Sequence, residues 1–599
     1  MKFILRTLCL LILLSPFFSH AEVEKRPNFM FILSEDNSMH FLRLYGDKAG
    51  ATPNIEAMAK QGLVFDHAFS CAPVCSVART TLMTGIYAPK LGTQYHRRSA
   101  LATLPEGVEM WPAYLRESGY YTSNNSKKDY NVKEGKVWDE SSKKATWRKR
   151  ADKGQPFFHM ETTTVSHESS LHFPASEMKK PTQTPQKDVW IAPYHPDTPE
   201  VRKDWAQYYD RLNKLDTWFG KQLDALKKAG LEEDTIVFFY GDHGSGMPRH
   251  KRYVGWSGLH VPLIVHIPEK YKHLRPKDYH AGEASERIVS FVDLAPTVLS
   301  LCEIPKKPYY QGHAFLGHQI EASPRYCFGF VGRADEHPDE SRSVFDGRYL
   351  YLHNFVPSLP QLKGLTYQME TRTTSQWKEL FDAGKLNKIQ AEPWSAPKAT
   401  RLLFDLKTDP YEVKNIIQEN PQIATRMASA LGDYFVKTGD LGLLSEGHLQ
   451  HALSVEKVTP VELAKTPFYQ EITQKFQKGE VIASHPGSLN QEQLQAFKER
   501  KGKKQPNYLR VLVLDTLMAQ KQESAYIDEL LIYCDPAKSD AYTALSAYQA
   551  LRKAKSISSE QYQILKELNT VPSQGTSPRV MKYAQRCKEL LLEELKPQS

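Results

Sequence analysis

Two clusters of chemically capable side chains each end an apolar run of strand length. Glu35 and Asp36 follow the run from 28 to 33, and Asp242 and His243 follow a similar run that ends at Tyr240. Neither run alternates apolar with polar residues, a pattern typical of strands buried on both faces of a parallel sheet. In such sheets, functional groups gather beyond the carboxyl ends of the strands. We therefore expect both clusters to belong to one site.

A cysteine in an unusual setting lies between these clusters in the sequence. Small residues at 72–74 lead into an expected helix that starts near Cys75 and carries Arg79 one turn further on. Unpaired N–H groups and the helix dipole stabilise an anion at a helix start, and residues four apart share a helix face. The segment thus predicts an anion-binding site. Taken alone, it is equally compatible with a structural cysteine buried at a helix start, and a bridge between Cys75 and Cys71 is a further alternative.

The elements that must position these residues alternate between strands and helices up to about residue 305. Helical spacing covers 53–62 and 111–118, and a long amphipathic helix is expected from about 204 to 228. Short apolar strands are expected at 157–160 and 261–267. The alternation predicts an α/β fold in which a large, mostly parallel sheet is sandwiched by helices.

The sequence pattern changes beyond residue 305. Strands of a smaller sheet are expected at 345–354 and 402–406, and helical patterns without a strict repeat period dominate from about 441. The expected helices of this last part cover 512–521, 526–533, 541–554 and 580–595. The predicted division is a leader at 1–21, an α/β domain at 22–305, a smaller α+β subdomain at 306–440 and a helical extension at 441–599.

The N-terminus has the form of a signal peptide. Lys2 and Arg6 precede an apolar run from 8 to 18, and small residues at 19 and 21 form a cleavage site. The run is too short for a stable membrane-spanning anchor, so we expect cleavage after Ala21 and a periplasmic or secreted protein. Six cysteines remain beyond the leader, which is too few for a disulfide framework in so long a chain.

The composition excludes several classes of protein. Of the 599 residues, 41% are hydrophobic and 25% are charged, which is usual for globular proteins and unlike disordered or fibrous chains. The formal net charge of +9, which falls by two when the leader is removed, suits an anionic substrate. The sequence has no dense basic stripe, so no nucleic-acid partner is expected.

The segment that begins at Cys75 resembles the signature of type I sulfatases, which belong to the alkaline phosphatase superfamily. The signature has a cysteine four residues before an arginine, here Arg79, and then a Thr-Gly pair, here Thr84 and Gly85. Val77 departs from it, because Pro or Ala is usual there. The resemblance is good over about 26–305 and looser to about 440, and it is greatest to bacterial relatives of heparan N-sulfatase and glycosaminoglycan sulfatases. It implies an alkaline-phosphatase-like fold.

The resemblance also implies a modified nucleophile and a metal ion. A formylglycine-generating or anaerobic sulfatase-maturing enzyme would oxidise Cys75 to formylglycine. One divalent ion, calcium, would be bound by Glu35, Asp36, Asp242 and His243, and hard carboxylate oxygens suit calcium. The family usually has Asp at the position of Glu35. A shared site of this kind requires residue 75 to lie within about 10 Å of the acidic groups, since calcium–oxygen bonds are roughly 2.3–2.6 Å.

Cations that bind the sulfate group follow from the same resemblance. Arg79, Lys127 and Lys251 match family positions, and their positive charge would offset charge on the sulfate oxygens. Lys128 and Arg252 are direct neighbours in sequence and are alternatives for the two lysines. Either lysine could also be a solvated loop charge.

The histidines and the remaining acid complete the implied catalytic set. His167 resembles the family's general acid, and Asp242 would accept the proton of the nucleophile. His96, shortly after the signature helix, is a candidate for substrate contact. Asp129 stands where many members have a histidine.

The predicted function is hydrolysis of a sulfuric ester or N-sulfate of a sulfated glycan, a glycosaminoglycan for instance, by a sulfatase without an integral membrane anchor. Two alternatives remain. The first is a phosphonate or phosphate monoester hydrolase of the same superfamily, and the second is an inactive glycan-binding relative, suggested by the departures at Val77, Glu35 and Asp129. The sugar would be selected by loops at 168–203 and 331–400, where Arg333, Asp335 and Glu336 are candidate lining residues.

Overall fold

The computed structural model describes residues 26–596 except 98–100, 336–338, 358, several positions between 445 and 457, most of 478–523, 536–540, 553, 555 and 569–577. The expected leader at 1–21, Glu336 and most of the helix expected at 512–521 lie outside the described residues. Within the described part of the chain, no helix combines the length and the apolar character needed to cross a membrane.

A sheet of eight strands occupies the centre of the part of the chain that the structure describes. Its strand order is β4-β3-β5-β1-β6-β7-β2-β8, and β7 alone runs antiparallel to its neighbours. The strands are β1 Asn28–Ser34, β2 Leu63–Phe69, β3 Tyr121–Asn125, β4 Glu140–Ser141, β5 Phe157–Thr163, β6 Thr235–Gly241, β7 Leu263–His266 and β8 Ala284–Ser290. The predicted mostly parallel α/β sheet is confirmed.

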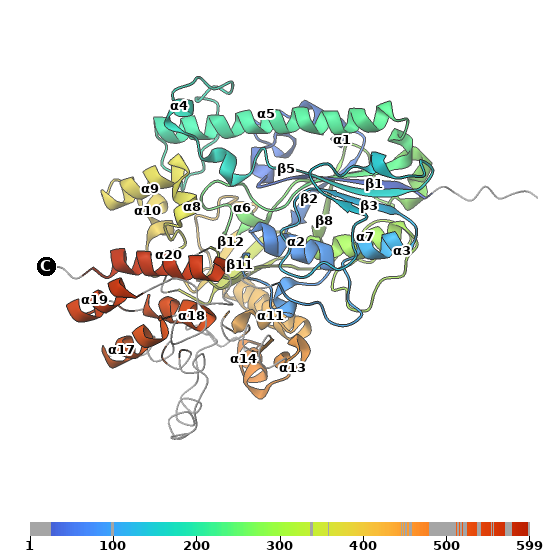
Figure 1. Ribbon diagram of the computed structural model, residues 1–599. Coiled ribbons are helices and arrows are strands. Elements are labelled where there is room, and N and C mark those ends of the chain that lie inside the picture. The colour runs from blue at the N-terminus through green and yellow to red at the C-terminus, as the bar shows by residue number, and fades with distance from the viewer. Residues whose placement is uncertain are drawn as a thin grey trace, which may run out of the picture.

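Helices cover both faces of this sheet. Figure 1 shows α1 and α5 on one face and α2, α3 and α7 on the other. These helices are α1 Pro53–Ala59, α5 Pro199–Lys228, α2 Cys75–Thr84, α3 Pro112–Glu117 and α7 Leu294–Leu301. The long helix begins before the expected residue 204, because Thr198 caps its N-terminus by accepting a hydrogen bond from the N–H of Val201.

The two-sided burial of β1 explains its unbroken apolar sequence. Phe31 packs on the face covered by α2, α3 and α7, whereas Met30 and Ile32 pack in a separate cluster with residues of α1 and α5. All seven residues of β1 are buried. Alternating side chains therefore enter two different cores, which explains the apolar residues from Phe29 to Leu33 between the polar ends of the strand.

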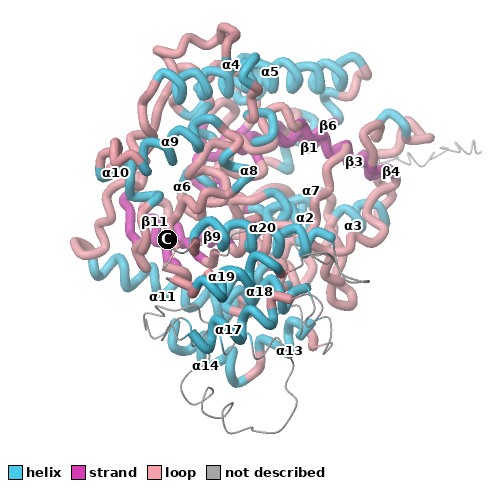
Figure 2. Tube along the Cα trace, turned by 60° about the vertical axis from the view of Figure 1, so that its left-hand side comes forward, coloured by secondary structure: helices cyan, strands magenta, loops and turns pink. Residues whose placement is uncertain are grey.

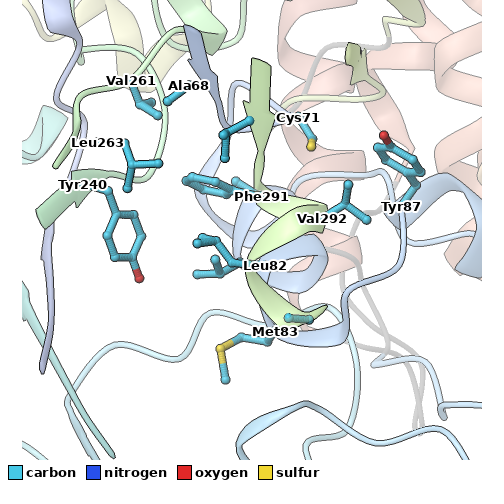
Figure 3. Packing of buried hydrophobic residues seen from close by; sticks show 14 of the residues in the cluster. Ala68, Cys71, Leu82, Met83, Tyr87, Tyr240, Val261, Leu263, Phe291 and Val292 are labelled. Carbon is cyan, nitrogen blue, oxygen red and sulfur yellow. The ribbon is translucent and has the colours of Figure 1, made fainter. Parts of the chain in front are cut away.

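The core beneath the signature helix is apolar and contains Cys71. Figure 3 shows Leu82 and Met83 of α2 close to Phe291 and Val292, with the Cys71 side chain in the same cluster. Burial raises the pKa of Cys71 to about 12, so its thiol stays protonated. The structure contains both Cys71 and Cys75 as free thiols.

A second sheet of four antiparallel strands follows, in the order β12-β11-β10-β9. Its strands are β9 Cys327–Val331, β10 Ser341–Phe345, β11 Tyr349–Asn354 and β12 Arg401–Asp405. The single strand expected at 345–354 is wrong: it combines the end of β10, a turn and β11. Gly347 adopts a φ of 97° in that turn, which glycine does without steric cost and which reverses the chain.

Helices surround the second sheet and make up the C-terminal part of the chain. The longer ones are α9 Arg372–Asp382, α11 Pro421–Thr438, α14 Pro467–Gln477, α17 Ser524–Tyr533, α18 Ala541–Leu551, α19 Ser559–Glu567 and α20 Pro578–Glu594. The short ones are α4 Ala175–Met178, α6 Trp256–Leu259, α8 Thr366–Met369, α10 Lys388–Ala391 and α13 Pro460–Ala464.

The last four helices form a group with a hydrophobic core of its own. Figure 2 shows α17, α18, α19 and α20 together, and Leu530, Tyr548 and Leu591 are among the buried residues that they share. The group also contacts the part of the chain that carries the second sheet, because the guanidinium of Arg586 in α20 donates to Thr366 Oγ1 at the start of α8, at 2.6 Å from Nε. The helical extension therefore lies against a loop of the second sheet.

The central strand supplies a direct test of the fold. Phe31 has no exposed surface and its ring lies 4.4 Å from that of Phe238 and 5.7 Å from that of Trp111. We expect Phe31→Ala to lower the free energy of unfolding by about 3–5 kcal/mol, because the cavity cannot collapse within a close-packed sheet. Denaturant unfolding followed by tryptophan fluorescence measures this. Val436→Ala, at a position that is 50% exposed, is the control, and an equal loss in both variants would contradict the assignment of the core.

Candidate active site

Parallel pairing brings the two strand-end clusters together. Ser34 of β1 lies opposite Gly241 of β6, so the residues that follow the two strands leave the sheet side by side. The backbone N–H of Asp36 donates to Asp242 Oδ1 at 2.9 Å. Asp36 has a φ of 48°, a left-handed conformation that is uncommon for a residue other than glycine and concentrates at functional sites.

Cys75 reaches the same place from a third segment of the chain. It is the first residue of α2 and is fully buried. Its Sγ lies 3.1 Å from His243 Nε2 and 3.8 Å from Asp36 Oδ1. The required proximity of residue 75 to the acidic groups is therefore present in the structure.

Four side chains are arranged so that they could hold a metal ion. Ligand atoms of Asp36, Cys75, Asp242 and His243 all lie within 4.8 Å of one another. Asp242 Oδ2 is buried and accepts no hydrogen bond, a costly arrangement that a cation would relieve. His243 Nδ1 lies 2.9 Å from the carbonyl oxygen of Gly244, so it donates there and leaves Nε2 to face the group. The carboxylate oxygens of Asp36 and Asp242 suit a hard divalent cation, whereas the sulfur of unmodified Cys75 does not.

Glu35 takes a different position from the other three expected ligands. Its Oε1 accepts a hydrogen bond from Arg79 Nη2 at 2.7 Å and forms an ion pair with Lys127 Nζ at 2.8 Å. Its Oε2 is buried without a hydrogen-bond partner. Glu35 lies outside the four-residue group, but one of its oxygens remains available for a cation.

The charges around Cys75 decide its ionisation. Burial alone would raise the pKa of the thiol, but Lys127, Lys251 and His243 together hold it well below the usual value. Burial likewise opposes protonation of His243, yet Asp242, Cys75 and Asp36 raise its pKa to about 9. In the absence of a cation, the two side chains form a thiolate–imidazolium pair at neutral pH.

Arg79, Lys127 and Lys251, the three cations expected to bind the sulfate group, surround the pair. Arg79 Nε lies 3.6 Å from Asp242 Oδ2, and Lys251 Nζ lies 2.8 Å from Asp36 Oδ2. Lys127, which follows β3, bonds to Glu35 as described above. Lys128 is not part of this cluster: its side chain is 40% exposed and pairs with Glu134. Of these two neighbouring lysines, the structure brings Lys127 alone to the site.

Glu168 is a site residue that sequence reasoning missed. Its backbone N–H donates to Asp36 Oδ2 at 2.7 Å, and its carboxylate lies 3.4 Å from Lys251 Nζ. Both of its carboxylate oxygens also accept from Arg252, which bonds to Asp335 as well. The position next to His167 was the only available signal, because these partners come from three distant segments. Glu168 links the two basic residues at 251 and 252 to the site.

His167 lies beside the acidic group on a loop after β5. It caps the short helix Glu168–Leu171, and its Nδ1 accepts a hydrogen bond from the Ser169 N–H at 3.2 Å. The proton of the neutral ring is therefore carried by Nε2. The ring is half-buried. Burial raises the pKa of Asp36, but Lys251 and, to a smaller extent, the protonated form of His167 hold it well below the usual value. When the ring is protonated, Nδ1–H can donate to Ser169 Oγ, 2.8 Å away, and the Nε2 proton can be given to a leaving group, which returns the neutral ring.

His96 and Asp129 border the site on the other side of Cys75. His96 Nδ1 lies 3.1 Å from Ser76 Oγ, and burial holds its pKa well below the usual value, so the ring is neutral. Asp129 accepts from Arg97 at 3.3 Å. His96 therefore contacts Ser76, the residue that follows Cys75, rather than the carboxylates of Glu35, Asp36 or Asp242.

Of the candidate lining residues in the loop after β9, two are described. Asp335 bonds to Arg252 at 2.9 Å. Arg333 is buried and bonds through Nη2 to Glu446 at 3.0 Å, which connects this loop to the start of the helical extension. Arg333 therefore contributes to the support of the site rather than to its open surface.

This fold and this cluster define a class of hydrolases whose nucleophile lies at a helix start, beside acidic metal ligands at strand ends. A sequence model of the sulfatase family matches residues 27–304. The chain is also 32% identical over 478 residues to an ulvan-active sulfatase of Formosa agariphila, covering 72% of this chain and 78% of the relative. The chain belongs to the sulfatase family and is an enzyme of that class.

More distant relatives agree with this assignment. The human N-sulphoglucosamine sulphohydrolase is 25% identical over 469 residues, covering 69% of this chain and 90% of that one. The solved structure of a 2-O glycosaminoglycan sulfatase superposes with a TM-score of 0.53 at 17% identity, covering 69% of this chain and 93% of that chain. At this identity, the superposition supports the fold alone.

The ionisation of Cys75 can be measured in unconverted, metal-free protein. We expect a thiolate absorbance near 240 nm at pH 7 that disappears in Cys75→Ala and is retained in Cys71→Ala. The sign follows from the lowered pKa: the thiolate persists as the pH falls below about 8.5, where a free cysteine would protonate. Difference spectra across a pH series give the value. A thiol that ionises only near pH 8.5 or above would contradict the described charge arrangement.

Proposed function

We propose that this protein removes sulfate from a sulfated glycan, cleaving a sulfuric ester or an N-sulfate. The observation that carries the proposal is the position of Cys75, whose Sγ lies 3.8 Å from Asp36 and 3.1 Å from His243 among Arg79, Lys127 and Lys251. Such a cluster of fixed cations stabilises a sulfuryl-transfer transition state, in which sulfur is trigonal bipyramidal and negative charge lies on the equatorial oxygens. The names of the relatives, one active on ulvan and one on N-sulphoglucosamine, support a saccharide substrate.

The nucleophile in this proposal is formylglycine at position 75. Its aldehyde, once hydrated, supplies one hydroxyl that attacks sulfur and a second whose deprotonation releases sulfate, which an unmodified thiol cannot do. A maturation enzyme would have to convert Cys75 before it is buried, since the side chain has no exposed surface in the fold. Val77, the departure from the signature, is fully buried in the apolar core below α2, so a larger apolar residue is accommodated there.

A divalent cation, which we propose to be calcium, would be held by Asp36, Asp242 and His243 with Glu35 at its free oxygen. Such an ion supplies Lewis-acid stabilisation of negative charge on the sulfate oxygens. The unpartnered oxygens of Glu35 and Asp242 support this ligand set.

The protein's own side chains would carry the protons and the remaining charge. In this proposal Asp242 accepts the proton of the attacking hydroxyl, and protonated His167 gives its Nε2 proton to the departing oxygen or nitrogen. Arg79, Lys127 and Lys251 would stabilise charge on the sulfate group. Their carboxylate partners hold these long side chains in place before substrate arrives, which lowers the cost of ordering them.

Export is part of the same proposal. A polymeric sulfated glycan does not enter cells readily, and the sequence pattern at 1–21 predicts a cleaved signal peptide that would bring the enzyme to its substrate.

Metal binding has a readout that is independent of activity. At calcium concentrations 100 times the dissociation constant, the free energy of unfolding should rise by about 2.7 kcal/mol, and chelation should reverse the change. We expect Asp242→Asn to abolish this increase. Asp129→Asn, which removes a nearby carboxylate that lies outside the ligand group, should retain it. Thermal melting with and without calcium measures both, and an equal response of the two variants would refute the ligand assignment.

Turnover tests the function itself. Protein matured in a host with the maturation enzyme should release sulfate from an aryl sulfate and from sulfated saccharides, and Cys75→Ala should abolish the release. Lys127→Met should lower kcat/KM by about 10²–10³-fold, because a fixed cation at the transition state is lost. Lys128→Met, the adjacent and exposed lysine, should leave kcat/KM nearly unchanged.

Two results would favour the alternatives. Faster hydrolysis of the phosphate ester than of the sulfate ester of one alcohol would indicate a phosphate or phosphonate hydrolase. Absence of formylglycine from the Cys75 peptide in the native host, measured by mass spectrometry, would indicate an inactive glycan-binding relative.

A further inference from the structure

Two adjoining pockets open beside the basic residues of the site. The first is lined by Lys363 and the second by Lys398. They share Arg252, Asp339 and Gln361 in their walls, and we refer to them together as the side pocket. The first is also lined by Lys251, which bonds to Asp36. The side pocket therefore lies next to the basic residues of the candidate active site.

Two lysines and one carboxylate meet in the wall of the side pocket. Lys363 Nζ lies 2.6 Å from Asp339 Oδ2, and Lys398 Nζ lies 2.9 Å from Asp339 Oδ1. The side chains are only 9% and 10% exposed for the two lysines and 10% for the aspartate. One positive charge thus remains uncompensated within the trio at a site that is largely removed from water, which is costly.

Other charged groups of the pocket walls have their own partners. Arg252 pairs with Glu168 and Asp335. Arg249 donates to backbone carbonyl oxygens at 411 and 412, and it also interacts with the exposed Glu392 at the rim. None of these supplies a second carboxylate to the two lysines. Burial outweighs the attraction of Asp339 and lowers the pKa of Lys363 to about 8, which agrees with a shortage of negative charge there.

A neutral donor in the same wall also lacks an acceptor. The side-chain Nε2 of Gln361 is buried and makes no hydrogen bond, although the residue lines both pockets. An unpaired buried amide costs free energy that an incoming oxygen would recover. Excess positive charge and an unused N–H donor in one cavity are together what an oxyanion requires.

We propose that the side pocket binds a second anionic group of the substrate, with Lys363, Lys398 and Gln361 as its ligands. This rests on the proposed function, because the first anionic group is the sulfate held by Lys251, Arg79 and Lys127. The substrate class is then a saccharide with two acidic groups, the scissile sulfate and either a second sulfate or a uronate carboxylate. Both are oxyanions that accept hydrogen bonds from ammonium and amide groups.

Lys363, Lys398 and Asp339 do not form a simple structural ion pair. A structural pair would need one lysine for Asp339, whereas here each carboxylate oxygen holds a separate lysine and thereby fixes two ammonium groups at the pocket wall. Removing either lysine leaves a neutral pair, so each single variant should fold. Asp339 acts as a positioning residue for both cations.

The test compares substrates that differ only in the second acidic group. Glucosamine 6-O-sulfate is compared with glucosamine N,6-O-disulfate, and a sulfated uronate-containing disaccharide is compared with its methyl ester. 4-Nitrophenyl sulfate reports the chemistry without a second anion. Lys363→Met and Lys398→Met are the variants, and Lys378→Met, at a partly exposed lysine of α9 paired with Asp382, is the matched control.

We expect both pocket variants to raise KM for a doubly acidic saccharide by roughly 10–100-fold, the usual effect of losing a charged hydrogen bond. KM for 4-nitrophenyl sulfate should remain within about threefold, since no contact with the pocket is involved. The substrate pair in which KM for the doubly acidic member rises, the disulfate or the uronate, shows whether the second group is a sulfate or a carboxylate. Equal effects on every substrate, or no effect on any in folded protein, would overturn the proposal while leaving the sulfatase assignment intact.

Failure of the proposed function has a different signature. Wild-type protein would then release no sulfate even from 4-nitrophenyl sulfate. Calorimetric binding of the same saccharides to Cys75→Ala protein still decides the role of the pocket. A preference for the doubly acidic member of a pair that is lost in Lys363→Met would support the side pocket, and equal affinities would refute it.

Discussion

Buried charge around Cys75 is the constraint on which the site depends. Carboxylates of Glu35, Asp36 and Asp242 leave the sheet within a few ångströms of one another, and they would repel if they were alone. Arg79, Lys127 and Lys251 offset that repulsion through direct ion pairs. Each partner is buried or nearly so, so removing one leaves an uncompensated charge in a poorly solvated place. The same groups that stabilise the apo fold are those that would bind sulfate and metal.

The fold places these charged groups at the carboxyl ends of two central strands of a very apolar sheet. Burial of the apolar side chains offsets the cost of holding the charges together. β1 buries its side chains in two different cores, and its register with β6 decides that Glu35 and Asp242 emerge together. Cys75 arrives from α2, whose remaining length is buried against the core that contains Cys71 and Val77. The position of the nucleophile is therefore determined by packing of the whole helix rather than by local contacts.

Segments beyond the α/β domain contribute to the surroundings of the site. The loop after β9 supplies Asp335 to Arg252, and Arg333 of that loop pairs with Glu446. α8 lies next to the loop that carries Lys363, and Arg586 of the helical extension bonds to its first residue, Thr366. The second sheet and the extension thus support one wall of the side pocket. This gives them a structural role, although the proposed catalytic groups lie mainly before residue 260.

Local pattern in the sequence was enough for the strands β1 and β6, for the start of α2 and for the acidic groups at the two strand ends, whereas Lys127 and Lys251 were expected only from the resemblance to sulfatases. These features depend on neighbours within a few positions: burial on both faces, a helix start and residues one turn apart. Tertiary structure alone revealed Glu168 as the link between Asp36, Lys251 and Arg252, the turn within 345–354, and the lysine pair that shares Asp339. Those contacts join segments far apart in the chain. Their partners are set by how loops pack on the sheet, and periodicity carries no information about such packing.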